Sequence, residues 1–183
     1  MIEVKDSILE GRLVDGKYQV EAKLGSGAMG AVYRARQLSL NRTVALKLIR
    51  REAVASWSGL KRFVQEAKLL TRLSHPNVVT VYDVELETEE PYIAMEYVEG
   101  PALYDVIEQP SRFPQPDPVI LARDLAGGLA YVHSQGVVHR DIKPANILLK
   151  EGSRAMLADF GLARAVDSAA LTTEGFVVGT PAY

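Results

Sequence analysis

Two short segments constrain this chain more than any other feature. Residues 139–146 read HRDIKPAN, and DFG follows at residues 159–161. Between them, 147–149 and 155–158 are apolar runs separated by a Glu-Gly-Ser turn at 151–153, which predicts two small paired strands. Carboxylates, an amide, a lysine and an arginine are therefore expected on loops at the ends of these strands.

The side chains in these loops suit metal-assisted phosphoryl transfer. Asp141, Asn146 and Asp159 offer the hard oxygen ligands that Mg²⁺ prefers, and a carboxylate can accept the proton of a hydroxyl nucleophile. Lys143 supplies a cation for a phosphate group. We expect these side chains to face a common cleft.

Length and composition exclude several other classes of protein. The 183 residues allow one domain or two small lobes, and the net charge of −2 gives no reason to expect nucleic acid or acidic lipid as a partner. Cysteine is absent, which excludes disulfides and thiolate metal sites. Neither a signal peptide nor a membrane-spanning run is evident, so a soluble, cytoplasmic chain without a membrane partner is expected.

A glycine-rich segment lies near the amino terminus. Residues 18–24 alternate in hydrophobicity, 25–30 read GSGAMG, and 31–36 continue as a second strand. In the dinucleotide-binding fold such glycines open a helix, and a P-loop would end in Gly-Lys-Ser/Thr. Strand on both sides favours a hairpin whose backbone N–H groups fold over phosphates, with an ordinary flexible hairpin as the alternative.

Lys47 is the second feature of this region. It lies within the apolar strand predicted over 43–49, where an unpaired charge would be unfavourable, so a phosphate or carboxylate partner is expected. Glu66, on the apolar side of a helix predicted over 59–73, is the candidate carboxylate. The alternatives are a lysine that reaches solvent and a glutamate paired on the surface.

In the middle of the chain we predict two strands at 78–82 and 91–95, a hinge at 96–100, and two helices at 103–108 and 119–135. The last helix is apolar over about half its circumference, more than the roughly 100° stripe of an ordinary surface helix. We therefore predict an exposed apolar patch around Leu121, Leu125 and Leu129, with self-association through it.

Taken together, HRDIKPAN, DFG, the glycine hairpin and the strand lysine resemble the catalytic domain of protein kinases. Lys143 resembles the serine/threonine branch, and GAMG with HRDIKPANILL is most similar to the eukaryotic-like kinases of bacteria. The resemblance runs from about Tyr18 to Tyr183. It implies an α+β fold with an antiparallel β-sheet lobe carrying one long helix and an incomplete, mainly helical second lobe. The implied division is a lead-in at 1–16, a first lobe at 17–96, a hinge at 97–101 and a partial second lobe at 102–183.

The resemblance also implies roles for individual residues. Asp141 would accept the proton of a protein serine or threonine hydroxyl, and Lys143 would neutralise the transferred phosphoryl group. Asn146 and Asp159 would hold Mg²⁺, with Mn²⁺ as an alternative ion. Lys47, paired with Glu66, would bind the α- and β-phosphates of ATP. The implied ATP-binding residues are Leu24, Gly25, Ser26, Gly27, Ala28, Met29, Gly30, Val32, Ala45, Lys47, Met95, Glu96, Val98 and Leu148.

Regulation is implied in the loop after DFG. Arg140 would pair with a phosphate on Thr172 or Thr173, and Thr180 would brace the catalytic aspartate and lysine. Phe160 would pack in a column with three residues of other elements, which are Leu70, Val81 and His139.

The chain ends in Gly-Thr-Pro-Ala-Tyr, before the Ala-Pro-Glu-type segment of the family and the helices beyond it. We therefore expect a C-terminally truncated kinase domain. Two alternatives stay open. One is a nucleotide-binding module without transfer activity, and the other is an interaction or scaffold protein.

Overall fold

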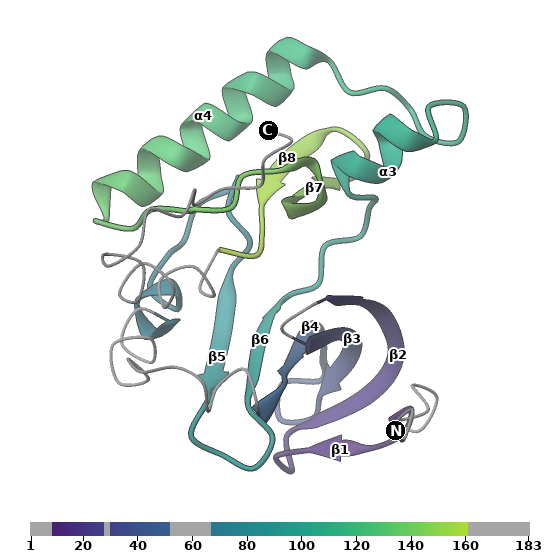
Figure 1. Ribbon diagram of the computed structural model, residues 1–183, viewed down its shortest axis with the longest axis vertical. Coiled ribbons are helices and arrows are strands. Elements are labelled where there is room, and N and C mark those ends of the chain that lie inside the picture. Colours follow the sequence, from purple (N-terminus) through teal and green to yellow (C-terminus); the bar gives the residue numbers. More distant parts are fainter. Residues whose placement is uncertain (1–8, 28–29, 52–66, 161–183) are drawn as a thin grey trace, which may run out of the picture. The chain divides into compact units, whose positions relative to one another are not determined.

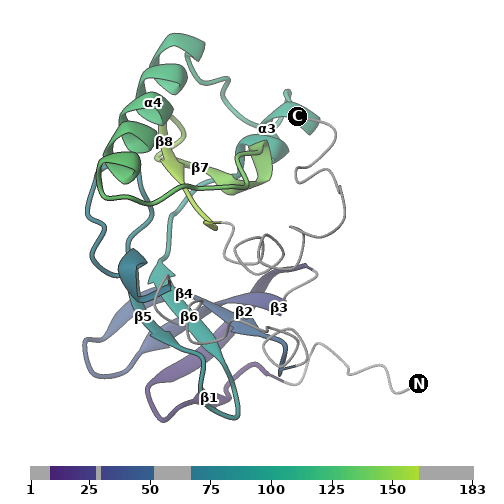
Figure 2. The same cartoon turned by 60° about the vertical axis from the view of Figure 1, so that its left-hand side comes forward.

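The computed structural model describes residues 9–27, 30–51 and 67–160 (Figures 1 and 2). These residues form two compact units. The first contains the described residues up to 51 together with Val81–Tyr97, and the second contains 67–80 with 98–160. Each unit has its own hydrophobic core.

The first unit is a curled antiparallel sheet, in which strand order is β1-β2-β3-β4-β6-β5. Its strands are β1 Leu13–Val14, β2 Tyr18–Gly27, β3 Gly30–Gln37, β4 Arg42–Ile49, β5 Val81–Glu85 and β6 Tyr92–Glu96. The strands predicted over 18–24, 31–36, 43–49 and 91–95 are confirmed. The β-sheet lobe of the expected fold is therefore present.

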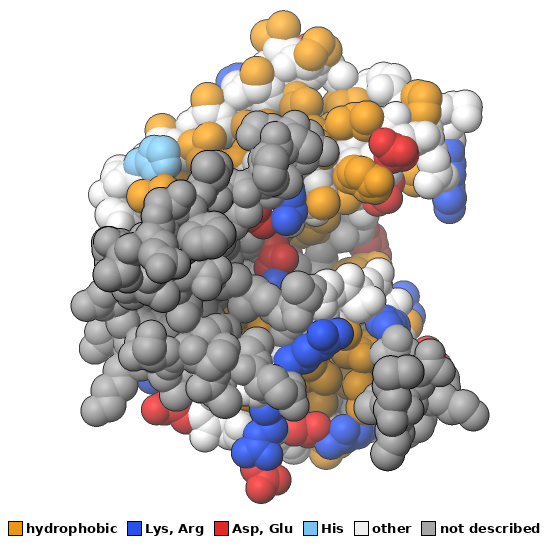
Figure 3. All heavy atoms as spheres, viewed as in Figure 1, with side chains coloured by type: hydrophobic (Ala, Val, Ile, Leu, Met, Phe, Trp, Pro, Cys, Tyr) orange, Lys and Arg blue, Asp and Glu red, His pale blue; other side chains and the backbone are white. Residues whose placement is uncertain are grey.

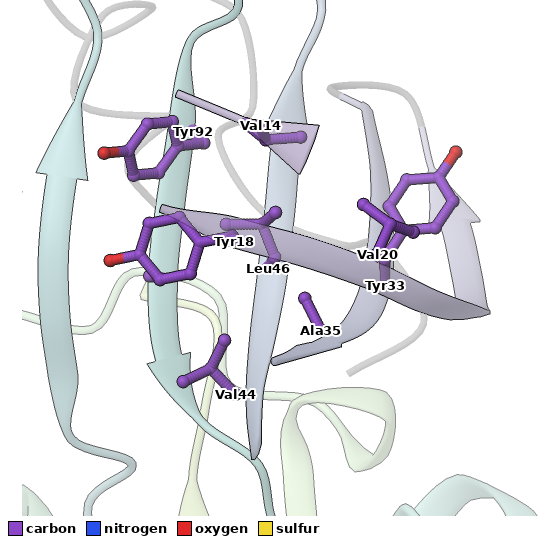
Figure 4. Close-up of a cluster of buried hydrophobic side chains, with 9 residues drawn as sticks. Val14, Tyr18, Val20, Tyr33, Ala35, Val44, Leu46 and Tyr92 are labelled. Carbon is purple, nitrogen blue, oxygen red and sulfur yellow. The ribbon is translucent and has the colours of Figure 1, made fainter. Parts of the chain in front are cut away.

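One face of this sheet encloses the core of the first unit. Val44 and Leu46 of β4 are fully buried there with Tyr18 and Tyr92, as Figure 4 shows. Because side chains alternate along a strand, Ala45 and Lys47 lie on the opposite face. The alternation predicted for this strand is therefore confirmed, and it separates the packing residues from the lysine.

Side chains connect the strands at the two edges of the sheet. The hydroxyl of Tyr92 lies 2.9 Å from Oδ2 of Asp15, in the turn after β1, and 2.9 Å from Oδ2 of Asp83 on β5. Tyr18 donates to the same Asp83 oxygen at 3.2 Å, and the ammonium of Lys17 lies 2.7 Å from Asp15. We call these five residues the polar clamp. It connects β1 and β2 to β5, the far edge strand, so the curled sheet is closed by side chains where no backbone ladder closes it.

The segment before β2 is more ordered than expected. Residues 1–16 were expected to be a loosely held lead-in, but Val14 is fully buried in the core. Gly11 donates to the Val20 carbonyl at 2.8 Å, the Arg12 carbonyl accepts from Val20 at 2.9 Å, and Arg12 forms an ion pair with Glu90. For residues 9–16 the expectation was therefore wrong. A two-residue strand is too short to produce a periodic pattern.

The second unit packs two helices against a small hairpin. Its elements are α3 Leu103–Glu108, α4 Pro118–Ser134, the 3₁₀ turn η2 Pro144–Asn146, β7 Ile147–Lys150 and β8 Arg154–Leu157. Both helices were predicted. Asp117 caps α4 by accepting from the backbone N–H groups of Val119 and Ile120, and Pro118 takes the first helical position. None of the described helices is long and apolar enough to cross a membrane.

The exposed patch predicted on α4 is wrong in its residues. Leu121, Leu125 and Leu129 are half-buried and pack against the core formed by α3, β7 and β8. Figure 3 shows apolar side chains along α4. The most exposed of its large apolar residues is Val119, at 75%. The apolar part of the helix is wide because small alanines lie on its exposed face. Hydropathy alone does not distinguish these exposed alanines from the leucines that pack inwards.

Two further boundaries differ from the prediction. The strand predicted over 78–82 begins only at Val81, because the preceding residues belong to the second unit, where Val79 donates to the Leu157 carbonyl at 2.9 Å. Of the helix predicted over 59–73, residues 67–70 are helical and the chain turns immediately afterwards. The part from 59 to 66, including Glu66, lies outside the described residues.

Replacing Tyr92 by Phe tests the polar clamp. Loss of the hydroxyl removes the one proton that Asp15 and Asp83 share and the oxygen that accepts from Lys17, so we expect a decrease of about 1–2 kcal/mol in the free energy of unfolding, measured with urea. Tyr104→Phe is the matched control, because Tyr104 lies exposed on α3 in the second unit. Equal stability of the two variants would show that the clamp adds nothing.

The clamp also predicts how stability depends on pH. Burial, with the nearby carboxylates, raises the pKa of Tyr18 and of Tyr92 well above the ordinary value of 10.0. In the unfolded chain both phenols lose their protons near pH 10, whereas the folded chain retains them. The free energy of unfolding should therefore fall as pH rises above about 10. A fluorescence-detected urea series should show a shallower alkaline loss for Tyr92→Phe, and an unchanged slope would contradict this explanation.

Candidate active site

Lys47 and the glycine hairpin belong to the first unit. Lys47 pairs across the sheet with Val32 on β3 and Ile93 on β6, and its neighbour on the same face, Ala45, pairs with Met95. The residues that pair with Lys47 are apolar, and Arg34 of β3, which forms an ion pair with Glu21, pairs with Ala45. Apolar residues beside a cation are what an aromatic base joined to phosphates requires.

The hairpin between β2 and β3 needs glycine at position 30, where β3 begins. Gly27 pairs with Gly30, and Gly30 has a φ of +156°. A Cβ at Gly30 would lie 1.9 Å from the Leu48 carbonyl oxygen, so no other residue fits there. At Gly25 and Gly27 a Cβ would meet no atom within 4 Å, so these two glycines leave the space over the hairpin open.

The other predicted nucleotide-binding residues are divided between the units. Leu24 is 47% exposed on β2, and Ser26 pairs with Ala31 in the hairpin. Glu96 ends β6 in the first unit, whereas Val98 and Leu148 belong to the second. Six predicted site residues lie outside the described residues: Ala28, Met29, Glu66, Thr172, Thr173 and Thr180.

The second unit brings three predicted catalytic residues together. Oδ2 of Asp141 lies 2.8 Å from the ammonium of Lys143 and accepts a 2.9 Å hydrogen bond from the Asn146 amide. The same amide nitrogen donates to the Asp141 carbonyl at 2.8 Å. A 3₁₀ turn, in which Asn146 N–H bonds to the Lys143 carbonyl at 2.9 Å, sets the spacing. One carboxylate is thus oriented by two partners from its own loop.

His139 joins this loop to the strand that precedes Asp159. Its imidazole Nε2 lies 2.9 Å from the Ala158 carbonyl oxygen, and the side chain is 1% exposed. A carbonyl only accepts, so Nε2 carries the proton, and Nδ1 accepts from the backbone N–H of Asp141 at 3.4 Å. Burial lowers the pKa of His139, which favours this neutral form.

Phe160 packs where the resemblance implies, at least with one member of the expected column. Its ring centroid lies 4.6 Å from that of His139, tilted by 33°. Leu70 and Val81, the other expected members, are both buried, the first in the second unit and the second in the first. The aromatic contact holds Phe160, the residue after Asp159, against His139.

Two residues of the site have unusual backbone conformations. Arg140 has a φ of +65° and Asp159 a φ of +55°, both in the left-handed region that non-glycine residues seldom adopt. Each is adjacent to a residue of the His139–Ala158 hydrogen bond. Conformations of this kind persist where surrounding contacts enforce them, and they gather at functional sites.

The oxygen donors of the second unit fit magnesium. The Asn146 amide nitrogen is engaged twice with Asp141, which leaves its amide oxygen as the end able to ligate a cation. Asp159 follows Ala158, whose N–H bonds to the Asn146 carbonyl at 2.9 Å. Among the described residues no group of three or more acidic, histidine or cysteine side chains could enclose a metal. Mg²⁺ commonly keeps waters and phosphates as ligands beside one or two protein oxygens.

Sequence reasoning missed two residues that support this site. Asp124 of α4 and Asn77 both bond to the backbone of β8 through their side chains. One feature of the sequence could have identified Asp124: it is an acidic residue among the apolar residues of a predicted helix, four residues before Gly128. Pattern reasoning treated the helix only by its apolar residues.

Comparisons with known proteins agree with this geometry. The family model described as the protein kinase domain matches residues 18–183. Serine/threonine-protein kinase PknL of Mycobacterium tuberculosis is 40% identical over 175 residues, which cover 96% of this chain and 44% of that protein. Serine/threonine-protein kinase PkaA of Streptomyces coelicolor is 39% identical, with 94% of this chain and 34% of that protein covered. The chain spans less than half the length of these relatives.

Solved structures give the same result. The crystal structure of the Mycobacterium tuberculosis PknI kinase domain superposes with a TM-score of 0.70 at 35% identity, covering 85% of this chain and 63% of that one. The predicted α+β kinase fold is confirmed. The extent of the family match and the identity to its members place this chain in the protein kinase family.

Proposed function

We propose that this chain carries out ATP- and magnesium-dependent phosphoryl transfer to serine or threonine hydroxyls of proteins, as part of a serine/threonine protein kinase. The observation that carries the proposal is the carboxylate of Asp141, which is oriented by Lys143 at 2.8 Å and by the Asn146 amide at 2.9 Å. A carboxylate held in this way is suited to orient a hydroxyl and accept its proton.

The residues of the second unit divide the chemistry among them. Asp141 receives the substrate proton, and Lys143 offsets negative charge on the phosphoryl group in transfer. His139 remains neutral and holds the catalytic loop against the strand before Asp159. These roles require positions fixed to fractions of an ångström, which the buried hydrogen bonds of this unit are suited to supply.

Asn146 and Asp159 would hold the magnesium ion. When bound, the ion would supply a positive charge that neutralises phosphate oxygens. Mn²⁺, which accepts the same oxygen ligands, is the expected substitute. The support for this assignment is the orientation of the Asn146 amide, whose nitrogen is engaged with Asp141.

The first unit would bind the nucleotide. The support is the face that carries Ala45 and Lys47, together with the open space over Gly25 and Gly27. We keep Glu66 as the proposed partner of the lysine, and residues 97–101 as the proposed hinge between the lobes. The convergence of Lys47 and Asp159 on one triphosphate is part of the proposal.

The proposed substrate is a protein, because the matched relatives are named serine/threonine-protein kinases. The cytoplasm is the proposed location, since ATP is available there. Self-association is not included, because the leucines of α4 that suggested it pack inwards.

Replacing Asp141 by Asn tests the mechanism. The variant keeps the shape of the side chain and removes the proton acceptor, so phosphoryl transfer from γ-labelled ATP to a generic protein acceptor should fall at least about a hundredfold. Binding of a non-hydrolysable ATP analogue with Mg²⁺, measured by calorimetry, should change little.

Asp105→Asn is the matched control. Asp105 lies in the same unit and accepts from the Ala102 N–H at 3.2 Å, a bond that asparagine can also accept. Its transfer rate should equal that of the unsubstituted chain. Equal rates for Asp141→Asn and the control would refute the proposed mechanism, whereas analogue binding without transfer in the unsubstituted chain would favour a nucleotide-binding module.

We also propose that the loop after Asp159 is an activation loop, regulated by phosphate on Thr172 or Thr173. The support is Arg140, an arginine adjacent to the catalytic aspartate with a left-handed backbone. A phosphate on the loop would pair with its guanidinium through charge-assisted hydrogen bonds.

Mass spectrometry after incubation with ATP and Mg²⁺ tests this regulation. Phosphate should be found on Thr172 or Thr173, and the double variant Thr172→Ala/Thr173→Ala should lose most of it. Asp141→Asn serves as the control without transfer. Phosphate confined to other positions would exclude these threonines as the regulatory sites.

A further inference from the structure

The outer edge of β8 is paired by side chains and by an irregular segment. The Ala155 N–H donates to Oδ2 of Asp124 at 3.3 Å, and the Ala155 carbonyl accepts from the Asn77 amide at 2.9 Å. Further along, Leu157 donates to the Asn77 carbonyl and its own carbonyl accepts from Val79, both at 2.9 Å. The backbone groups on this edge therefore all have partners, and Asp124 satisfies the first of them.

Asp124 is an unusual residue for this position. It is 6% exposed in the middle of α4, where an acid needs compensating partners. Its Oδ1 accepts from Arg123 at 2.8 Å and 3.2 Å, and the Arg123 side chain itself is 72% exposed. One carboxylate oxygen is therefore neutralised from the solvent side, and the other is aimed at the strand.

The helix face that carries Asp124 is shaped for close contact with β8. Its buried residues are Asp124, Gly128 and Val132, one turn apart from each other. A Cβ at Gly128 would lie 2.9 Å from the Asn77 carbonyl oxygen and 3.0 Å from Cδ1 of Leu157. Without this glycine α4 would stand further from the strand. The close approach brings the carboxylate within reach of the Ala155 N–H, and Figures 1 and 2 both show α4 beside β8.

β8 leads directly into the metal-binding position. Two residues after its end comes Asp159, and the intervening Ala158 is held by the Asn146 carbonyl and by His139. Ala158 thus fixes the end of the segment, whereas Asp124 fixes its beginning. Only Ala158 separates β8 from Asp159, so a shift of β8 that also displaces Ala158 would move Asp159.

We propose that Asp124 is a positioning residue for the site: by its hydrogen bond to the Ala155 N–H it sets the place of β8 and so of the Asp159 carboxylate. This inference rests on the proposed function, in which Asp159 holds Mg²⁺. Asp124 acts on the metal through the strand and does not touch it. Outer groups of this kind commonly change metal affinity by about 10–100-fold when removed.

The test compares three variants of the whole chain. Asp124→Leu removes the acceptor, and Asp124→Asn retains an oxygen that accepts from the Ala155 N–H. Asp117→Ala is the control, because it removes the cap of the same helix without touching β8. The two measurements are hydrogen exchange of the Ala155 amide and the affinity for a non-hydrolysable ATP analogue, with and without Mg²⁺, by calorimetry.

We expect Asp124→Leu to speed exchange at Ala155 and to reduce the Mg²⁺-dependent gain in analogue affinity about tenfold, with affinity in the absence of Mg²⁺ unchanged. Asp124→Asn should restore both values. Asp117→Ala should lower the melting temperature and leave both values unaltered. If the leucine variant does not fold, Asp124→Ala replaces it with the same expectation.

Two results would overturn the inference. One is an unchanged Mg²⁺-dependent gain in Asp124→Leu, and the other is an equal loss in Asp117→Ala, which would assign the effect to helix stability. Failure of the proposed function is distinguished by the unsubstituted chain, which would then show no Mg²⁺-dependent gain. In that case exchange at Ala155 still decides whether Asp124 holds the strand, and an unchanged rate in Asp124→Leu would refute it.

Discussion

The hydrogen bond between the His139 imidazole and the Ala158 carbonyl is the interaction on which the chemistry proposed for the second unit depends. It connects the loop that carries Asp141 with the segment that leads to Asp159, together with the hydrogen bond from the Ala158 N–H to the Asn146 carbonyl and the ring contact between His139 and Phe160. Burial strengthens this hydrogen bond. The buried imidazole is neutral and has a single N–H, which donates to the Ala158 carbonyl. The left-handed backbones on either side, at Arg140 and Asp159, are conformations that such an enforced contact can maintain.

The two units solve different packing problems. The first has a long sheet whose edges must be protected, and it curls so that tyrosines of β2 and β6 meet edge to face, with centroids 5.3 Å apart. Their hydroxyls then reach the carboxylates of the polar clamp. The second has only a two-stranded sheet, too small to be stable alone, and covers it with α3 and α4. In both units polar side chains form hydrogen bonds at a sheet edge where no neighbouring strand pairs with the backbone.

Glycines mark the places where backbone segments approach most closely. Gly30 admits the Leu48 carbonyl, Gly100 admits the Leu149 carbonyl, and Gly128 admits Asn77 against α4. Each lies beside a proposed functional segment: the phosphate-binding hairpin, the hinge and the strand before Asp159. These contacts explain why the glycine at 128, which weakens a helix by its intrinsic propensity, is compatible with a stable α4.

The sequence by itself determined the family, most strand and helix positions, and the set of oxygen and nitrogen donors, because these depend on local patterns and on motifs with fixed spacing. Lys47 was assigned to its face of β4 by alternation alone. The tertiary structure decided what local patterns do not contain. It placed Val14 in the core, turned the leucines of α4 inwards, moved the start of β5 to Val81, and gave Asp124 and Asn77 to the edge of β8. Each of these depends on a partner distant in the chain, and a residue's own neighbours in sequence carry no record of that partner.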